Sequence, residues 1–152
     1  MMRLLDYIRE DSVFIVDVVD SFDAMIEMAV RVLAPKINCT PEIAMSSIKQ
    51  REIASSTAIG FGCAIPHAVL QNASKTVAGV LVLKNPLKIP TPDGIDVDIV
   101  FIIMGNPQDA RIHLKLLSKI ARILHEEEIR DKLRSSKTCQ EVMNILGAKD
   151  ED

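Results

Sequence analysis

Two apolar runs of strand length, at residues 76–83 (TVAGVLVL) and 97–104 (VDIVFIIM), constrain the fold of this chain most strongly. The second run is apolar on both faces, which is typical of a central strand that is covered on each side. Three prolines and an Asp93-Gly94 turn between the runs predict a surface loop. A sheet of this kind needs helices against it, so the pattern predicts an α/β layered domain.

Hydrophobic spacing and capping residues predict the other elements. A strand is expected at 12–18, and a third strand, at 63–65, precedes the two long runs. The order is strand, two helices, three strands, three helices, which favours a three-layer α/β/α domain with a central mixed sheet. The acidic tail at 150–152 is expected to be frayed. The helices are predicted from Asp20 or Ser21 to Pro35, from Thr40 to about Arg51, and after Asp109, Glu126 and Thr138.

Composition limits the function. A chain of 152 residues has the length of one domain, so we expect a single domain over residues 1–152. The net charge of −3 argues against a protein that binds nucleic acid. The three cysteines are widely spaced, so neither a disulfide framework nor a metal site is expected, and a reducing cytoplasm fits. No apolar run approaches the length of a membrane span. We therefore expect a soluble cytoplasmic protein without direct membrane insertion.

Residues 51–67 (REIASSTAIGFGCAIPH) have the features of a segment that presents one nucleophile. Gly60 and Gly62 permit positive φ or close approach of another group to the backbone. Pro66 favours extended geometry at its neighbour, so His67 is expected at the rigid end of a strand. An unprotonated imidazole there could attack an electrophile near neutral pH. The alternative is a structural histidine that is bound to a backbone carbonyl.

This segment resembles the active-site signature of the enzyme IIA components of the bacterial sugar phosphotransferase system, in the fructose, mannitol and nitrogen-regulatory class. That signature has Arg-Glu, then Ser-Thr-x-Ile-Gly-x-Gly, then Ala-Ile-Pro-His. The chain matches it with Arg51-Glu52, residues 56–62 and residues 64–67. It departs from the common pattern at Ser55, Ala58 and Phe61, where the family often has glycine, glycine and a polar residue.

His113 is the second candidate. On the helix predicted after Asp109, it falls on the apolar face near Leu117, so it is expected to point inward. Residues 113–117 (HLKLL) are also similar to a His-Leu-Lys-x-Leu helix start in the same family. A buried histidine in a purely structural role is the alternative.

The resemblance implies a phosphoryl relay. His67 would accept the phosphoryl group from the phosphohistidine of HPr or its nitrogen-branch counterpart, and an enzyme IIB component or a regulatory protein would receive it. Such transfer needs positioning and positive charge more than acid-base groups, so no cofactor or metal is expected. Arg51 could contribute a guanidinium and His113 a ring N–H. The candidate phosphate-binding residues, with hydroxyl or backbone N–H donors, are Ser56, Thr57, Gly60 and Gly62.

The sequence also permits two other interpretations. Cys63 and His67 could form a nucleophilic pair, although four extended residues separate them by about 13 Å. The chain could also be a regulatory module that binds partners without turnover, since fold does not fix function. Phe61, between two glycines, is expected to be exposed and to contribute to partner docking. Its alternative is to fold back over the loop.

Overall fold

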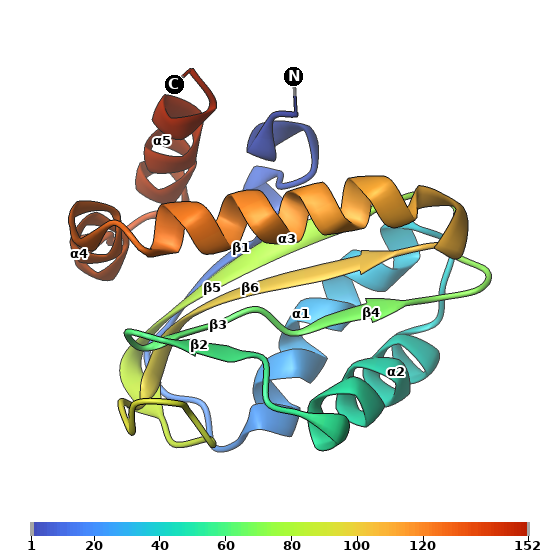
Figure 1. The fold of residues 1–152 in the computed structure, drawn as a ribbon, viewed down its shortest axis with the longest axis horizontal. Coiled ribbons are helices and arrows are strands. Elements are labelled where there is room, and N and C mark those ends of the chain that lie inside the picture. The colour runs from blue at the N-terminus through green and yellow to red at the C-terminus, as the bar shows by residue number, and fades with distance from the viewer. Residues whose placement is uncertain (1, 152) are drawn as a thin grey trace.

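A six-stranded mixed sheet forms the middle layer of the computed structural model, which describes residues 2–151 (Figure 1). β6 lies inside the sheet, antiparallel to β5 on one side and parallel to β3 and β4 on the other. β1 pairs in parallel with β5, and β2 pairs with β3. The strands are β1 (Val13–Val16), β2 (Ala58–Gly60), β3 (Cys63–Ala64), β4 (His67–Val69), β5 (Val77–Leu87) and β6 (Val97–Gly105).

Helices cover both faces of the sheet (Figure 1). The side chains of β6 alternate between two cores, with Val100 and Ile102 in one and Phe101 and Ile103 in the other. The first core contains α1 (Phe22–Lys36) and α2 (Pro41–Ala54). The second contains α3 (Ala110–Leu124), α4 (Glu127–Ser135) and α5 (Cys139–Asp150). The predicted three-layer α/β/α architecture is confirmed, because β6 presents apolar side chains to both layers.

Three short 3₁₀ helices complete the described part of the chain, at Leu4–Asp6 (η1), Glu10–Ser12 (η2) and Pro107–Asp109 (η3). No helix within residues 2–151 is both long enough and apolar enough to cross a membrane.

The strand predicted at 63–65 is present but shorter, as β3, and the structure adds a separate strand, β4, that begins at His67. Both strands lie along the same edge of β6. Pro66 has no N–H for the ladder, so the pairing stops there and resumes at the next residue. His67 therefore begins a strand instead of ending one.

Some helix boundaries also differ from the prediction. α1 continues through Pro35, because a proline in the last turn interrupts only one hydrogen bond of the helix. α3 is not capped by the Asp109 side chain. Asn106 caps the preceding 3₁₀ turn instead, where its side chain accepts a hydrogen bond from the Asp109 N–H at 2.9 Å.

Asp150 contradicts the expectation of a frayed tail. Its carboxylate accepts the N–H groups of Leu4 and Leu5 at 2.6 and 3.0 Å and pairs with Lys119 at 2.9 Å. Burial raises the pKa of this carboxyl, but the two backbone hydrogen bonds and Lys119 outweigh burial and lower it overall. The carboxylate thus joins both ends of the chain to α3, while Asp152 lies outside the described residues.

Candidate functional site

His67 begins β4 and lies beside Ile103 of β6. Its Nδ1 is 2.8 Å from the carbonyl oxygen of Ile65. A carbonyl can only accept, so Nδ1 carries a proton, and in the neutral ring Nε2 therefore keeps its lone pair. The backbone contact that a structural histidine would make is therefore present. It also sets the neutral tautomer in which Nε2 carries the lone pair.

His113 reaches the same place from the first turn of α3. The rings of His67 and His113 meet edge to face, with centroids 5.4 Å apart. His113 is 8% exposed, and its Nδ1 has no hydrogen-bond partner among the described residues. Burial, followed by the nearby charge of His67, lowers the pKa of His113. The structure thus brings the two candidate histidines together and favours a neutral ring at His113.

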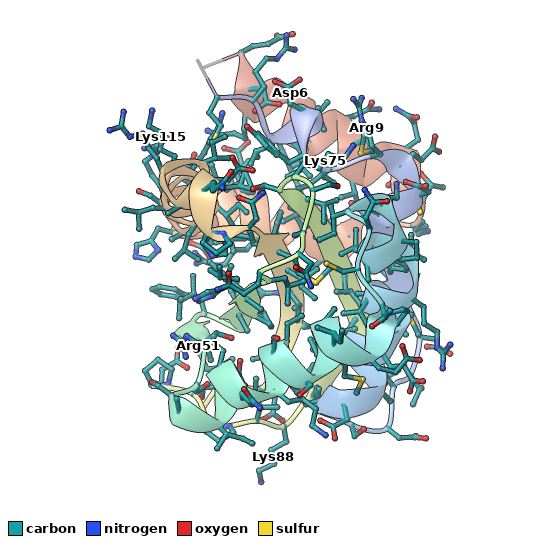
Figure 2. All side chains as sticks on the ribbon, turned by 90° about the vertical axis from the view of Figure 1, so that its right-hand side faces the viewer. Asp6, Arg9, Arg51, Lys75, Lys88 and Lys115 are labelled. Atoms are coloured by element: carbon teal, nitrogen blue, oxygen red, sulfur yellow. The ribbon has the colours of Figure 1, made fainter. Side chains whose placement is uncertain are left out.

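Arg51 lies in the last turn of α2, near its C-terminal end (Figure 2). Its Nη1 donates to the carbonyl oxygen of Ser55 at 2.7 Å. That contact caps the end of the helix, where backbone carbonyls lack helical partners. Within residues 2–151 no hydrogen bond joins Arg51 to either histidine. A guanidinium has five N–H donors, so the contact with Ser55 leaves other donors of Arg51 available.

Thr57 is held by Glu52, a residue to which the sequence pattern assigned no separate role. The Glu52 carboxylate accepts the Thr57 N–H at 2.8 Å and the Thr57 hydroxyl at 2.7 Å. The Thr57 carbonyl then accepts the N–H of Ile65 at 3.1 Å. Ile65 is the residue whose carbonyl binds His67. A continuous path of hydrogen bonds thus runs from Glu52 to the imidazole, so Thr57 positions this loop and its hydroxyl proton is already engaged.

Ser56, Gly60 and Gly62 make no hydrogen bond to either histidine within residues 2–151. The Ser56 hydroxyl donates to the carbonyl of Pro90 at 2.7 Å. Both glycines have the expected positive φ, 93° and 76°, because they shape the β2–β3 hairpin. Cys63, the residue after this hairpin, lies opposite Ile99 of β6, whereas His67 lies opposite Ile103. Four residues along a strand separate Cys63 from His67 by about 13 Å. This placement argues against direct phosphate contact by either glycine.

Phe61, at the tip of the same hairpin, is 43% exposed, as predicted. The Arg130 guanidinium carbon lies 4.4 Å from its ring centroid, and the His125 ring packs against it at 5.6 Å. Its φ of 60° is unusual for a residue with a side chain, and its N–H donates to Asp93 at 2.8 Å. One side of the ring is thus covered by its neighbours, and docking by the remaining part stays a prediction.

The geometry excludes a nucleophilic pair formed by Cys63 and His67. Cys63 is buried, and burial raises the pKa of its thiol to about 11. Cys63 lies opposite Ile99 and His67 opposite Ile103, about 13 Å apart along the edge of β6. A protonated thiol at that distance cannot be activated by the imidazole.

Glu52→Gln should weaken the loop that positions His67. Its amide cannot accept both donors of Thr57 as the carboxylate does, and a hydrogen bond to a charged group contributes about 1.5–3 kcal/mol. We expect a loss of that size in the free energy of urea unfolding, with a change in the ¹⁵N shifts of the His67 ring. Glu42→Gln, in the first turn of α2, should cost less than about 1 kcal/mol and leave those shifts unchanged. Equal effects of the two variants would contradict a specific role for Glu52.

Comparison with known proteins connects these features to one family. The family model described as "Phosphoenolpyruvate-dependent sugar phosphotransferase system, EIIA 2" matches residues 6–149. A nitrogen regulatory protein of Bradyrhizobium diazoefficiens is 37% identical over 97 residues, which are 64% of this chain and 63% of that protein. The match thus spans somewhat less than two thirds of this relative. A nitrogen regulatory protein of Escherichia coli K12 is 30% identical over 122 residues, 80% of this chain and 75% of the relative.

Solved structures of enzyme IIA proteins have the same fold as this chain. The crystal structure of the nitrogen regulatory protein IIA-Ntr from Neisseria meningitidis covers 93% of this chain and 97% of its own, with a TM-score of 0.87 and 25% identity. The enzyme IIA of the Escherichia coli mannitol system, solved in complex with phosphorylated IIB, shares the fold with a TM-score of 0.76 and 16% identity, over 91% of this chain and 95% of its own. The matched family model covers nearly the whole chain, and the chain therefore belongs to the EIIA 2 family of the phosphoenolpyruvate-dependent sugar phosphotransferase system.

Proposed function

We propose that this protein is a cytoplasmic phosphocarrier that accepts a phosphoryl group on Nε2 of His67. The observation that carries this proposal is the histidine pair. Nδ1 of His67 is held by the Ile65 carbonyl at 2.8 Å, and the His113 ring lies beside it. An imidazole with a fixed tautomer, next to a second imidazole with an unpaired buried nitrogen, suits transfer of a charged group better than structural packing.

The donor in this proposal is the phosphohistidine of an HPr-type carrier or its nitrogen-branch counterpart. The lone pair of Nε2 attacks phosphorus in line with the donor P–N bond, which breaks as the new bond forms. The donor imidazole leaves with the electron pair of that bond. The positive charge that develops on the His67 ring is stabilised by the Nδ1–H bond to the Ile65 carbonyl. No ATP or metal takes part in this step.

His113 and Arg51 complete the proposed phosphate site. A phosphoryl group on Nε2 would lie beside the His113 ring, which can donate an N–H to one of its oxygens. His113 is in the first turn of α3, where the helix dipole also favours an anion. Arg51 would reach the phosphoryl group by exchanging its contact with the Ser55 carbonyl for two bonds to phosphate oxygens.

The proposed onward acceptor is an enzyme IIB component or a regulatory protein. Two kinds of relative support this choice, namely the nitrogen regulatory proteins and the mannitol IIA that was solved with phosphorylated IIB. In either case the phosphoryl group leaves Nε2 by the reverse of the step that brought it there.

The direct test is incubation of the protein with phosphoenolpyruvate, enzyme I and an HPr-type or nitrogen-branch carrier. We expect one phosphate per chain, labile to acid and stable to alkali, as phosphohistidine is. Intact-protein mass spectrometry measures the stoichiometry. If neither carrier type delivers phosphate, the phosphocarrier proposal fails, and a regulatory module that binds partners without turnover becomes the better account.

A further inference from the structure

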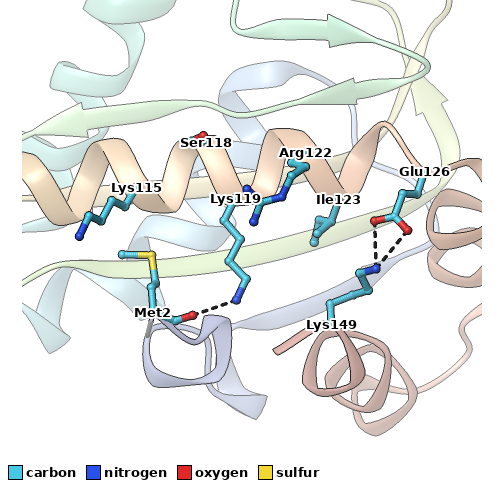
Figure 3. A pocket seen from close by; sticks show the side chains of 8 residues that line it. All are labelled: Met2, Lys115, Ser118, Lys119, Arg122, Ile123, Glu126 and Lys149. Carbon is cyan, nitrogen blue, oxygen red and sulfur yellow. Dashed lines mark hydrogen bonds and ion pairs between the residues drawn. The ribbon is translucent and has the colours of Figure 1, made fainter. Parts of the chain in front are cut away.

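A concave site lies on the outer side of α3, away from the inward face that carries His113. This groove is bounded by α3, Met2 and the end of α5, and its volume is about 490 Å³ (Figure 3). That volume falls within the range of small-molecule sites. Lys119 reaches across it to the carbonyl of Met2, and Lys149 reaches Glu126 (Figure 3). The eight lining residues are Met2, Lys115, Ser118, Lys119, Arg122, Ile123, Glu126 and Lys149.

The groove concentrates positive charge in a chain whose net charge is −3. Lys119 pairs with Asp150 and Lys149 with Glu126. Lys115 and Arg122, seven residues apart and thus on one face of α3, make no hydrogen bond or ion pair with another residue between 2 and 151. Lys115 and Arg122 therefore contribute an excess of two positive charges that no carboxylate among residues 2–151 pairs with. An excess of this size matches the charge of a phosphate monoester near neutral pH.

Lys119, at the floor of the groove, is held in place by contacts within the protein. The Lys119 side chain is 13% exposed and its Nζ makes two hydrogen bonds, to the Met2 carbonyl and to Asp150. An ammonium has three donors, so one remains for an occupant of the groove. Little side-chain entropy would then be lost at this position on binding, because the contacts that fix Lys119 exist beforehand.

We propose that this groove binds a small phosphorylated sugar or polyol. Arg122 and Lys115 would hold the phosphate from two sides, and the third N–H of Lys119 would reach it from the floor. The exposed Ser118 hydroxyl, between the two free cations on the same face, suits a hydroxylated body. None of the eight described lining residues is aromatic, so the groove lacks the stacking surface that would favour a nucleobase.

Calorimetric titration at low ionic strength with glucose 6-phosphate as the probe tests this proposal. We expect saturable binding with one site per chain, weaker binding of inorganic phosphate and of AMP, and no binding of glucose. Lys115→Ala and Arg122→Ala should each weaken binding about tenfold, because each removes a charge-assisted hydrogen bond to the phosphate. His67→Ala should bind the probe normally, so failure here is distinguishable from failure of the phosphocarrier proposal.

The matched control is Lys88→Ala, which removes one positive charge from an exposed position at the opposite end of the molecule from Asp6 and Arg9 (Figure 2). It should leave the affinity unchanged. Absence of saturable binding would overturn the proposal. An equal loss in the Lys88 and Arg122 variants would also overturn it, because binding would then reflect net charge alone. Tighter binding of AMP than of glucose 6-phosphate would reject the sugar class.

Discussion

His67→Ala should abolish phosphoryl acceptance while the protein remains folded. The variant lacks the only atom that we assign as nucleophile, Nε2, and the neighbouring His113 is buried and not placed at the start of a strand. The expected result is complete loss of the acid-labile phosphate after incubation with phosphoenolpyruvate, enzyme I and the carrier. Mass spectrometry of the intact protein measures that loss, and circular dichroism confirms the fold.

His125→Gln is the matched control for this experiment. His125 is exposed, follows α3 directly and packs against Phe61 instead of His67. Its replacement removes a histidine without touching the proposed site, so phosphorylation should reach the same stoichiometry as in the unaltered protein. Label that persists in His67→Ala, or that disappears in His125→Gln, would contradict the assignment.

His113→Ala and Arg51→Ala should each slow phosphoryl transfer much more than they lower the melting temperature. Each removes a donor that we place around the phosphoryl oxygens, and loss of one such donor typically lowers a rate by about two to three orders of magnitude. Rapid-quench measurement of phosphorylation gives the rate, and thermal unfolding gives the stability. Removing His113 also removes a buried nitrogen that has no partner, which limits the stability cost.

Arg31→Ala provides the control for the loss of an arginine, since Arg31 is exposed on α1 and pairs with Glu27. It should leave the transfer rate unchanged. If His113→Ala instead lost several kcal/mol of stability and its folded fraction were phosphorylated at the normal rate, His113 would be a structural residue. The proposed site would then consist of His67 alone.

The sequence by itself determined the elements that depend only on residues close together along the chain. Every residue of the run at 97–104 except Asp98 is apolar, so side chains on both faces of the strand favour burial and the run forms an inner strand. The Thr40-Pro41 start of α2 and the Thr138 cap of α5 satisfy helix N–H groups within three residues. His113 points inward because a helix repeats every 3.6 residues, and its neighbours Leu116 and Ile120 must be buried.

Only the tertiary structure decided which of these residues meet. The 5.4 Å approach of His67 and His113 depends on the register of β4 against β6 and on the packing of α3 over the sheet. Asp150 binds Leu4 across 146 residues, which no local pattern encodes. Gly60 and Gly62 share the motif with His67 but lie elsewhere, because an extended chain advances about 3.3 Å per residue. Sequence spacing fixes the direction of a side chain within its own element, whereas contacts between elements follow from how the apolar faces pack.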